Sequence, residues 1–128
     1  MPDEFGIQLL GLLNYHNIST SDIKEAAIAS VVPHLTTRWI QVCHDYLGCL
    51  PLVIDSNTTL GINILVDKPS EVGADRIVDA VAAHEIFGGP ACIIDFGTAT
   101  TFDAISSKGD YLGGAISPGI GISRDALS

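Results

Sequence analysis

The chain has 128 residues, of which 47% are hydrophobic and 16% are charged, and its formal net charge is −9 at pH 7. This length and composition exclude an intrinsically disordered protein and predict a small folded domain. The acidic excess argues against nucleic acids and anionic membrane surfaces as partners, because both attract Lys and Arg. An anionic ligand would need a bound cation, backbone N–H groups or a few well-placed basic residues.

The first part of the chain alternates helical and extended patterns. In order, the sequence predicts a helix at 3–14, a buried strand at 26–32 ended by Pro33, a helix from Thr36 or Thr37 to about Gly48, strands at 52–55 and, more weakly, 62–65, and a helix at 74–86. Inward-facing positions are expected at Trp39, Val42, Cys43 and Tyr46 in the second helix, and at Ile77, Val78, Val81 and Ala82 in the third.

After Pro90 the pattern changes to three strand-like runs, at 91–95, 100–106 and 111–117, and a further helix starts at about Ser123. Strands alternating with helices predict an α/β fold. The change of pattern suggests a domain boundary, with one part at 1–90 and another at 91–128. A three-stranded meander with open edges is an unfavourable end for a domain, so we expect an internal piece of a longer protein.

The three cysteines, Cys43, Cys49 and Cys92, fit neither an even disulfide framework nor a Cys-x-x-Cys pair. Cys92 lies in an apolar run and is expected to be a buried core residue. The sequence contains no signal-peptide pattern and no apolar stretch long enough to cross a bilayer. We therefore expect the reducing cytoplasm, with no membrane association.

The segment 91–103, Ala-Cys-Ile-Ile-Asp-Phe-Gly-Thr-Ala-Thr-Thr-Phe-Asp, combines an apolar strand with an acid, a glycine turn and several hydroxyls. Gly97 would let the backbone approach a phosphate, and Thr98, Thr100 and Thr101 could donate hydrogen bonds to it. Asp95 offers a hard oxygen ligand for a cation that offsets phosphate charge. The alternative is an ordinary hairpin, in which the threonines serve β-propensity.

A second cluster, at 67–76, precedes the predicted helix at 74–86. Asp75 lies where the helix dipole favours a carboxylate, and such an acid can accept a proton from an attacking hydroxyl. Arg76 has a guanidinium suited to a substrate carboxylate. The alternative is structural, with Asp75 as a helix N-terminal acid and Arg76 paired with Glu71 or Asp79 on the surface.

Both clusters resemble motifs of type III pantothenate kinases, which belong to the superfamily of acetate and sugar kinases, heat-shock ATPases and actin. Asp-x-Pro-x-Glu-Val-Gly-Ala-Asp-Arg-Ile-Val, at 67–78, is similar to the family's pantothenate-binding loop, and 95–103 is similar to its second phosphate motif. Further similarities lie at 29–33 and 111–119. The resemblance implies a ribonuclease H-like (actin-like ATPase) α/β fold. Residues 1–90 would form the end of the first lobe and residues 91–128 the opening strands of the second.

The resemblance also implies ATP-dependent phosphorylation of pantothenate, the first step toward coenzyme A. Gly73, Ala74, Asp75 and Arg76 would bind pantothenate, with Asp75 as the proton acceptor. Asp95 would be the ligand of a monovalent cation, K⁺ or NH₄⁺, and Thr98 would contact ATP. Mg²⁺ and a homodimer are expected in the complete protein.

Three departures from the family pattern are visible. The chain has no counterpart of the family's opening Asp-x-Gly-Asn-Thr loop, and it lacks the C-terminal part with a threonine that reaches the substrate across the dimer. Val66 also stands where the family has a substrate-contacting tyrosine. We therefore expect this chain alone to be inactive. The alternative is a non-catalytic truncated relative that acts as a ligand-binding or regulatory module.

Overall fold

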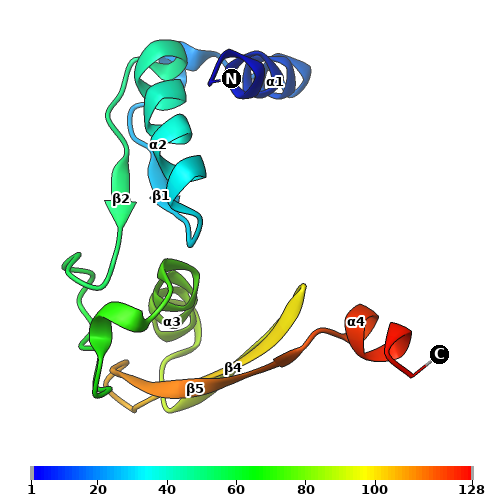
Figure 1. The fold of residues 1–128 in the computed structure, drawn as a ribbon. Helices are drawn as coiled ribbons and strands as arrows, with labels where there is room; N and C mark the ends of the chain where they lie inside the picture. The colour runs from blue at the N-terminus through cyan, green and yellow to red at the C-terminus, as the bar shows by residue number, and fades with distance from the viewer. Residues whose placement is uncertain (1, 128) are drawn as a thin grey trace. The chain divides into compact units, whose positions relative to one another are not determined.

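The computed structural model describes residues 2–127, which fall into two compact units, one ending at Ile54 and the other beginning at Asp55 (Figure 1). Each unit combines helices with strands, which confirms the α/β class. The division at 90/91 concerns the lobes of the complete fold and stays a prediction.

The first unit contains two main helices and a two-stranded sheet. Its elements are α1 (Pro2–Tyr15), η1 (Thr20–Asp22), β1 (Ala27–Ala29), α2 (Pro33–Val42), the π-helical η2 (Cys43–Leu47) and β2 (Leu52–Ile54). β1 and β2 are parallel, with Ala27 opposite Leu52. The predicted helix at 3–14 and the predicted strand at 52–55 are thus confirmed.

Two predictions for this unit are wrong in detail. The strand at 26–32 is shorter, and Ala27 and Ala29 are exposed rather than buried, because β1 pairs with β2 alone and the sheet offers little cover. Pro33 does not end that strand but begins α2, at a position where its missing N–H costs no helical hydrogen bond. Thr36 therefore lies inside the first turn, where its hydroxyl donates to the Val32 carbonyl at 3.2 Å.

The end of this helical segment is as predicted, at Gly48, which has the left-handed conformation (φ +69°) favourable to glycine. Val42 and Cys43 are buried, as expected, whereas Trp39 and Tyr46 are half-buried. The Tyr46 ring covers Gly6 of α1, and its hydroxyl donates to Asp3 at 2.8 Å. Because Gly6 has no side chain, α1 can approach η2 closely.

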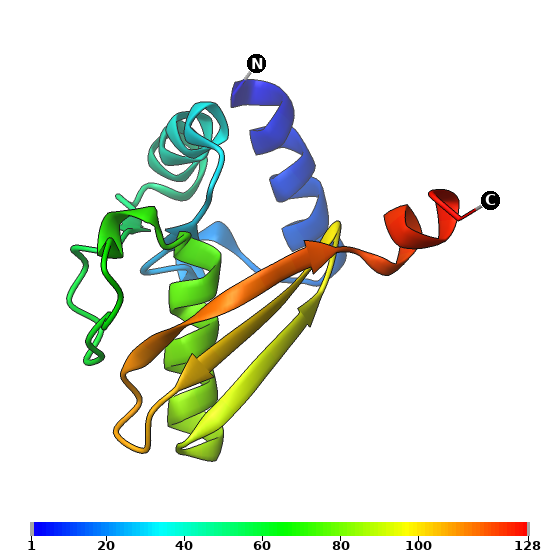
Figure 2. The same ribbon diagram turned by 60° about the horizontal axis from the view of Figure 1, so that its bottom comes forward.

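The second unit consists of one long helix on a three-stranded antiparallel sheet. Its elements are η3 (Pro69–Glu71), α3 (Ala74–Phe87), β3 (Ala91–Phe96), β4 (Ala99–Ile105), β5 (Tyr111–Pro118) and α4 (Ile120–Asp125), and the strand order is β3-β4-β5. The predicted helix and the three predicted strands are confirmed. Figure 2 shows α3 lying along one face of the sheet. α4 begins earlier than expected, directly after Gly119.

The core of this unit lies between α3 and the sheet. Ala80, Ile105 and Tyr111 are its buried residues, and Ile62 and Ile64 pack against them. The predicted strand at 62–65 is wrong, because this segment forms only one parallel bridge, between Ile64 and Tyr111, and no longer ladder. Of the positions expected to face inward on α3, Ile77 is buried, Val78 and Val81 are half-buried, and Ala82 is exposed.

The sheet face opposite α3 is open in the described part of the chain. Successive residues of a strand point to opposite faces, so the positions that pair as Cys92–Ala104 and Ile94–Phe102 share the uncovered face. Cys92 is exposed, and the expectation that it is a core residue is wrong because α3 covers only one side.

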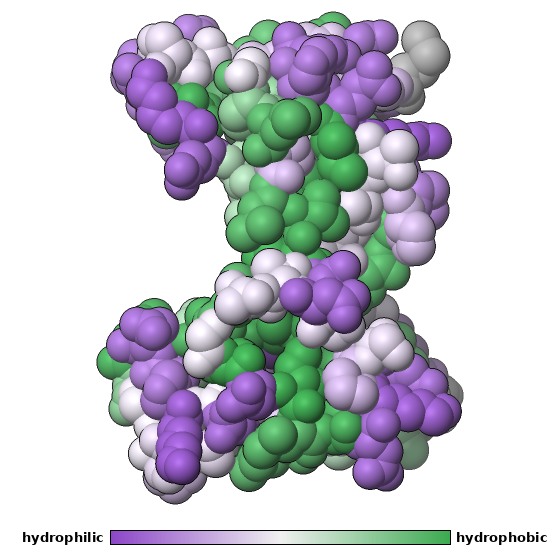
Figure 3. Space-filling view, turned by 90° about the vertical axis from the view of Figure 1, so that its left-hand side faces the viewer, coloured by the Kyte–Doolittle hydropathy of each residue, from purple (hydrophilic) through white to green (hydrophobic). Residues whose placement is uncertain are grey.

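Apolar surface is extensive in both units. Large exposed side chains include Leu52 in the first unit and Phe96 and Ile116 in the second. Figure 3 shows apolar surface on one side of each unit. None of the helices in residues 2–127 has the length and apolar character needed to cross a membrane.

Candidate functional site

The Gly-Ala-Asp-Arg segment forms the N-terminus of α3. Gly73 is the extended residue before the helix, and Ala74 is the buried first residue. Asp75 lies in the first turn with an exposed side chain, and its Oδ1 accepts a hydrogen bond from the Arg76 backbone N–H at 2.8 Å. Its carboxylate is thus held near the positive end of the helix dipole while remaining accessible.

Arg76 turns inward toward the sheet instead of pairing on the surface. Its Nε donates to Asp103 Oδ1 at 2.8 Å, and its Nη2 lies 2.5 Å from the same oxygen. Neither surface partner that was considered for it, Glu71 or Asp79, forms this ion pair; Glu71 instead accepts from Lys68 at 2.9 Å. The hydrogen bond and charge of Asp103 raise the pKa of the guanidinium, so it stays cationic.

The turn between β3 and β4 carries the second motif. The backbone N–H of Gly97 donates to the Ala99 carbonyl at 2.9 Å, and that of Gly119 donates to the Thr98 carbonyl at 3.1 Å. A side chain on Gly119 would overlap the carbonyl oxygens of Gly97 and Thr98, so the start of α4 packs directly against the turn. Asp95 and Thr98 keep exposed side chains. β3 and β4 form a hairpin, as both interpretations of this segment require.

The carboxylate of Asp79, in α3, is affected by the negative charges of three other carboxylates. The pKa of Asp79 is raised, mainly by burial and then by the negative charges of Asp95, Asp75 and Asp103. The two acids that the sequence singled out, Asp75 and Asp95, therefore act on a common neighbour. Asp79 was not predicted as part of the site, although its position one helical turn after Asp75 could have indicated it.

A pocket of about 420 Å³ lies beside Arg76, and we call it the Arg76 pocket. Besides Arg76, its wall is formed by Val66, Asp67, Lys68, Glu71, Val72, Tyr111, Gly113 and Gly114. Lys68 and Arg76 give it two cationic side chains. Val66, where the family resemblance leads one to expect a tyrosine, lies in this wall and provides no hydroxyl.

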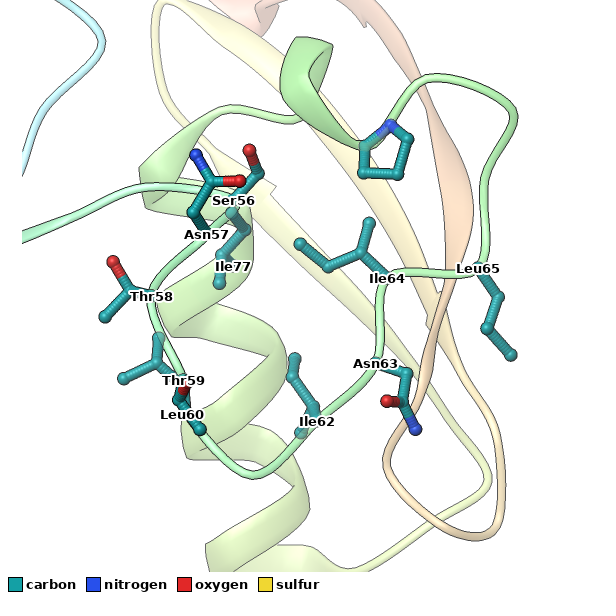
Figure 4. A pocket seen from close by; sticks show the side chains of 11 residues that line it. Ser56, Asn57, Thr58, Thr59, Leu60, Ile62, Asn63, Ile64, Leu65 and Ile77 are labelled. Atoms are coloured by element: carbon teal, nitrogen blue, oxygen red, sulfur yellow. The ribbon is translucent and has the colours of Figure 1, made fainter.

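A second pocket, of about 530 Å³, contains none of the candidate site residues, although Pro69 and Ile77 of the 67–78 segment line it. Figure 4 shows it between the 56–60 loop, the extended segment around Asn63, and Ile77 of α3. Its rim is rich in hydroxyl and amide groups, whereas Ile62, Ile64 and Ile77 give it apolar walls. It belongs to the same unit as the Arg76 pocket but lacks a charged side chain among its lining residues.

Three residues around Arg76 were given no role by the sequence reasoning. Asp103 is only 1% exposed, Tyr111 donates to its Oδ1 at 2.6 Å, and Gly114 lies opposite it in the β4–β5 ladder. The available signal was an acid between the apolar residues Phe102 and Ala104 of a strand, because a buried carboxylate requires a cationic or hydrogen-bonding partner. Nothing in the sequence indicated that this partner is Arg76.

Within residues 2–127 no group of three or more His, Cys, Asp or Glu side chains is arranged to hold a metal ion. The exposed carboxylate of Asp95 is nonetheless the kind of oxygen donor that hard cations prefer. A cation at Asp95 would fit only if other oxygens, such as those of a bound phosphate, completed its ligands. This donor chemistry suits a cation shared with a nucleotide.

Comparison with known proteins identifies the family. A family model described as type III pantothenate kinase matches residues 1–128. The chain is similar to the type III pantothenate kinases of Moorella thermoacetica (53% identical over 125 residues), Paramagnetospirillum magneticum (52% over 126) and Rhodospirillum rubrum (49% over 126). Each match covers 98% of this chain but only 49%, 48% and 49% of the respective relative.

The chain thus spans about half the length of the curated relatives it matches. Its helices and strands correspond to part of the ribonuclease H-like, actin-like ATPase fold that the sequence motifs predict. The match includes both chemical motifs and the strands and helix that carry them. This protein chain belongs to the type III pantothenate kinase family.

Proposed function

We propose that the complete protein transfers a phosphoryl group from ATP to pantothenate, giving 4′-phosphopantothenate, as a cytoplasmic enzyme of coenzyme A biosynthesis. The observation that carries this proposal is that the N-terminus of α3 and the β3–β4 turn, which bear the two family motifs, belong to one compact unit. The shared influence of Asp75 and Asp95 on Asp79 supports their proximity.

Asp75 is the proposed catalytic base. Its carboxylate is exposed and lies in the first turn of α3. It would accept the proton of the pantothenate hydroxyl while that oxygen attacks the γ-phosphorus of ATP and ADP leaves. Gly73 and Ala74 would contribute backbone to the same loop, so the substrate hydroxyl would lie against the helix N-terminus.

The Arg76 pocket is the proposed binding site for pantothenate. Pantothenate carries a carboxylate, and a guanidinium is the side chain best suited to bind a planar carboxylate. Arg76 is held cationic by Asp103, and Lys68 adds a second positive charge at the pocket wall. Because Lys68 is paired with Glu71 and Asp67 also lines the pocket, Arg76 would be the main cationic group for an anionic substrate.

Asp95 and Thr98 are proposed to serve the nucleotide. Asp95 would bind a monovalent cation, K⁺ or NH₄⁺, and the Thr98 side chain would contact ATP. Mg²⁺ would accompany the nucleotide and be held largely by its phosphates, consistent with the lack of a carboxylate cluster among the described residues. When bound, these cations supply positive charge near the phosphates.

A homodimer of the complete protein is part of the proposal. The apolar side chains exposed in each unit, among them Leu52 and Ile116, support burial against further polypeptide. The family resemblance supplies the expectation that this polypeptide includes a second copy. Molecular mass in solution, measured by light scattering on the complete protein, tests it directly.

The decisive experiment measures ADP release by the complete gene product with pantothenate and ATP. Asp75→Asn should lower kcat by about 10²–10⁴-fold while leaving the fold intact, because the proton acceptor is lost. Asp22→Asn, an exposed acid of the other unit, should leave turnover unchanged. An Asp75→Asn enzyme with normal turnover would refute the assignment.

Pantothenate binding without ADP release would favour the second candidate, a non-catalytic relative that binds a ligand or regulates a partner. Val66 at the pocket wall is the observation that supports it, since a hydroxyl expected for substrate contact is missing. The sign of such a protein is pantothenate binding, measured calorimetrically, without ADP release. Turnover by the unaltered protein would eliminate this candidate.

A further inference from the structure

Arg76 is supported by two side chains to which the sequence motifs assigned no role. Asp103 comes from the middle of β4, and Tyr111 is the first residue of β5. Arg76 Nε and the Tyr111 hydroxyl both donate to Asp103 Oδ1, at 2.8 Å and 2.6 Å. The guanidinium carbon also lies 5.9 Å from the centre of the Tyr111 ring, within cation–π range.

This support is buried and therefore rigid. Asp103 and Tyr111 are each 1% exposed, and Tyr111 belongs to the core cluster with Ala80 and Ile105. Burial and the hydrogen bond to Asp103 raise the pKa of the Tyr111 hydroxyl, so it remains a donor at all physiological pH values. A buried carboxylate that receives two donors on one oxygen has few alternative geometries.

Asp103 contacts one side of the guanidinium, through Nε and Nη2, and leaves the other side unpaired within residues 2–127. Arg76 Nη2 is buried and lies near Asp103, yet it has no hydrogen-bond partner with suitable geometry among the described residues. The side chain as a whole is 16% exposed and forms part of the pocket wall. Gly114 makes the arrangement possible, because a Cβ there would overlap both Arg76 Nη2 and Asp103 Oδ1.

We propose that Asp103 and Tyr111 are positioning residues, which hold the Arg76 guanidinium at the wall of the Arg76 pocket with N–H groups left for a carboxylate ligand. The proposal rests on the proposed function, since pantothenate is the carboxylate in question. Tyr111 would affect the ligand only through Arg76, because its own hydroxyl donates to Asp103. Removing that hydroxyl should therefore weaken pantothenate binding and leave ATP binding unaffected.

The test uses steady-state kinetics on the complete gene product with Tyr111→Phe, Arg76→Lys and the double variant. Tyr111→Phe should raise the KM for pantothenate about two- to tenfold, the worth of one hydrogen bond, without changing the KM for ATP. In the Arg76→Lys background the same change should have less than about a twofold effect, because the guanidinium it positions is gone. Equal effects in both backgrounds, or on both substrates, would overturn the proposal.

Tyr46→Phe is the matched control. Its hydroxyl also donates to an aspartate, Asp3, at 2.8 Å, but in the other unit and outside the Arg76 pocket. It should leave the KM for pantothenate unchanged. A rise equal to that of Tyr111→Phe would mean that loss of any such bond has the same effect, and would overturn the proposal.

A measurement without turnover separates this inference from the proposed function. In the NMR spectrum, the Nε–H proton of Arg76 should exchange slowly with water in the unaltered protein and at least about tenfold faster in Tyr111→Phe, because its acceptor Asp103 is then less fixed. Unchanged exchange would overturn the positioning role. If the unaltered protein neither binds nor phosphorylates pantothenate, the proposed function fails, while this exchange comparison still decides whether Tyr111 fixes Arg76.

Discussion

Gly114 lies directly opposite Asp103 in the β4–β5 ladder, and a methyl group at residue 114 would overlap the Asp103 carboxylate. The same methyl group would overlap Arg76 Nη2 and the Phe102 carbonyl. The buried ion pair between α3 and β4 therefore depends on a missing side chain in a third element, β5.

Gly114→Ala should be destabilising. The added carbon must displace backbone or the buried ion pair, and overpacking of this kind costs about 1–3 kcal/mol of unfolding free energy. Urea denaturation followed by circular dichroism measures the change. Gly121→Ala, in α4, is the control, because a Cβ there meets nothing within 4 Å. Equal stability of the two variants would contradict the overlap at residue 114.

Two glycines of α1 should respond in opposite directions to the same substitution. A Cβ at Gly6 would overlap the Tyr46 ring, whereas a Cβ at Gly11 meets nothing within 4 Å. Gly6→Ala should therefore lower the unfolding free energy by about 1–3 kcal/mol, and Gly11→Ala should raise it by about 0.5–1 kcal/mol through helix propensity. Thermal denaturation of the two variants checks both signs; a stabilised Gly6→Ala protein would show that α1 does not pack on η2.

The stability of the second unit should increase when Asp79 loses its charge. The pKa of Asp79 is raised by burial and by Asp95, Asp75 and Asp103, so its ionised form is disfavoured in the folded state. Ionised Asp79 therefore lowers the free energy of unfolding. This loss of stability develops as the pH rises from about 4, the ordinary pKa of an aspartate, through the higher pKa in the folded state. Asp79→Asn should thus raise the melting temperature near neutral pH, and this gain should shrink as the pH falls toward 4.

Asp110→Asn, in the same unit, should change the melting temperature in the opposite direction to Asp79→Asn. Hydrogen bonds from the Asn63 amide and other donors lower the pKa of Asp110, so its ionised form is favoured in the folded state. The stability that ionised Asp110 contributes is fully present above the ordinary pKa of a carboxyl group. It is lost as the pH falls through the lowered pKa of the folded state. Asp110→Asn should therefore lower the melting temperature at neutral pH. Two variants that shift in the same direction would contradict this electrostatic account.

Val66 is the position where a gain of function is expected. It lines the Arg76 pocket, and its side chain lies near Gly113, which has a positive φ of 116° and no side chain. Val66→Tyr would place a hydroxyl at the pocket and should lower the KM for pantothenate about two- to tenfold in the complete protein. Val66→Phe, which adds the ring without the hydroxyl, separates the hydrogen bond from the change in size. An unchanged or higher KM for Val66→Tyr would show that this pocket does not bind pantothenate in the proposed way.

The sequence by itself determined most of the secondary structure and the two chemical motifs. Helical spacing indicated α1 and α3, and short strand-like runs indicated β3, β4 and β5, because these patterns depend on which local residues can bury one face. It placed the start of α2 wrongly, since a proline can either stop a strand or occupy the first turn of a helix. The Gly73–Arg76 and Asp95–Thr98 segments were recognisable because their residues are adjacent in the chain.

Only the tertiary structure decided which residues act together. Asp103 is 27 residues from Arg76 in the sequence, and Gly114 belongs to a third element, so no local pattern could link them. Likewise, Cys92 is exposed and Ile93 is packed against the core because α3 covers one sheet face and leaves the other open. Local patterns reflect the backbone's periodicity, but the partner of a buried charge and the covered face of a sheet depend on contacts between segments that are distant in the chain.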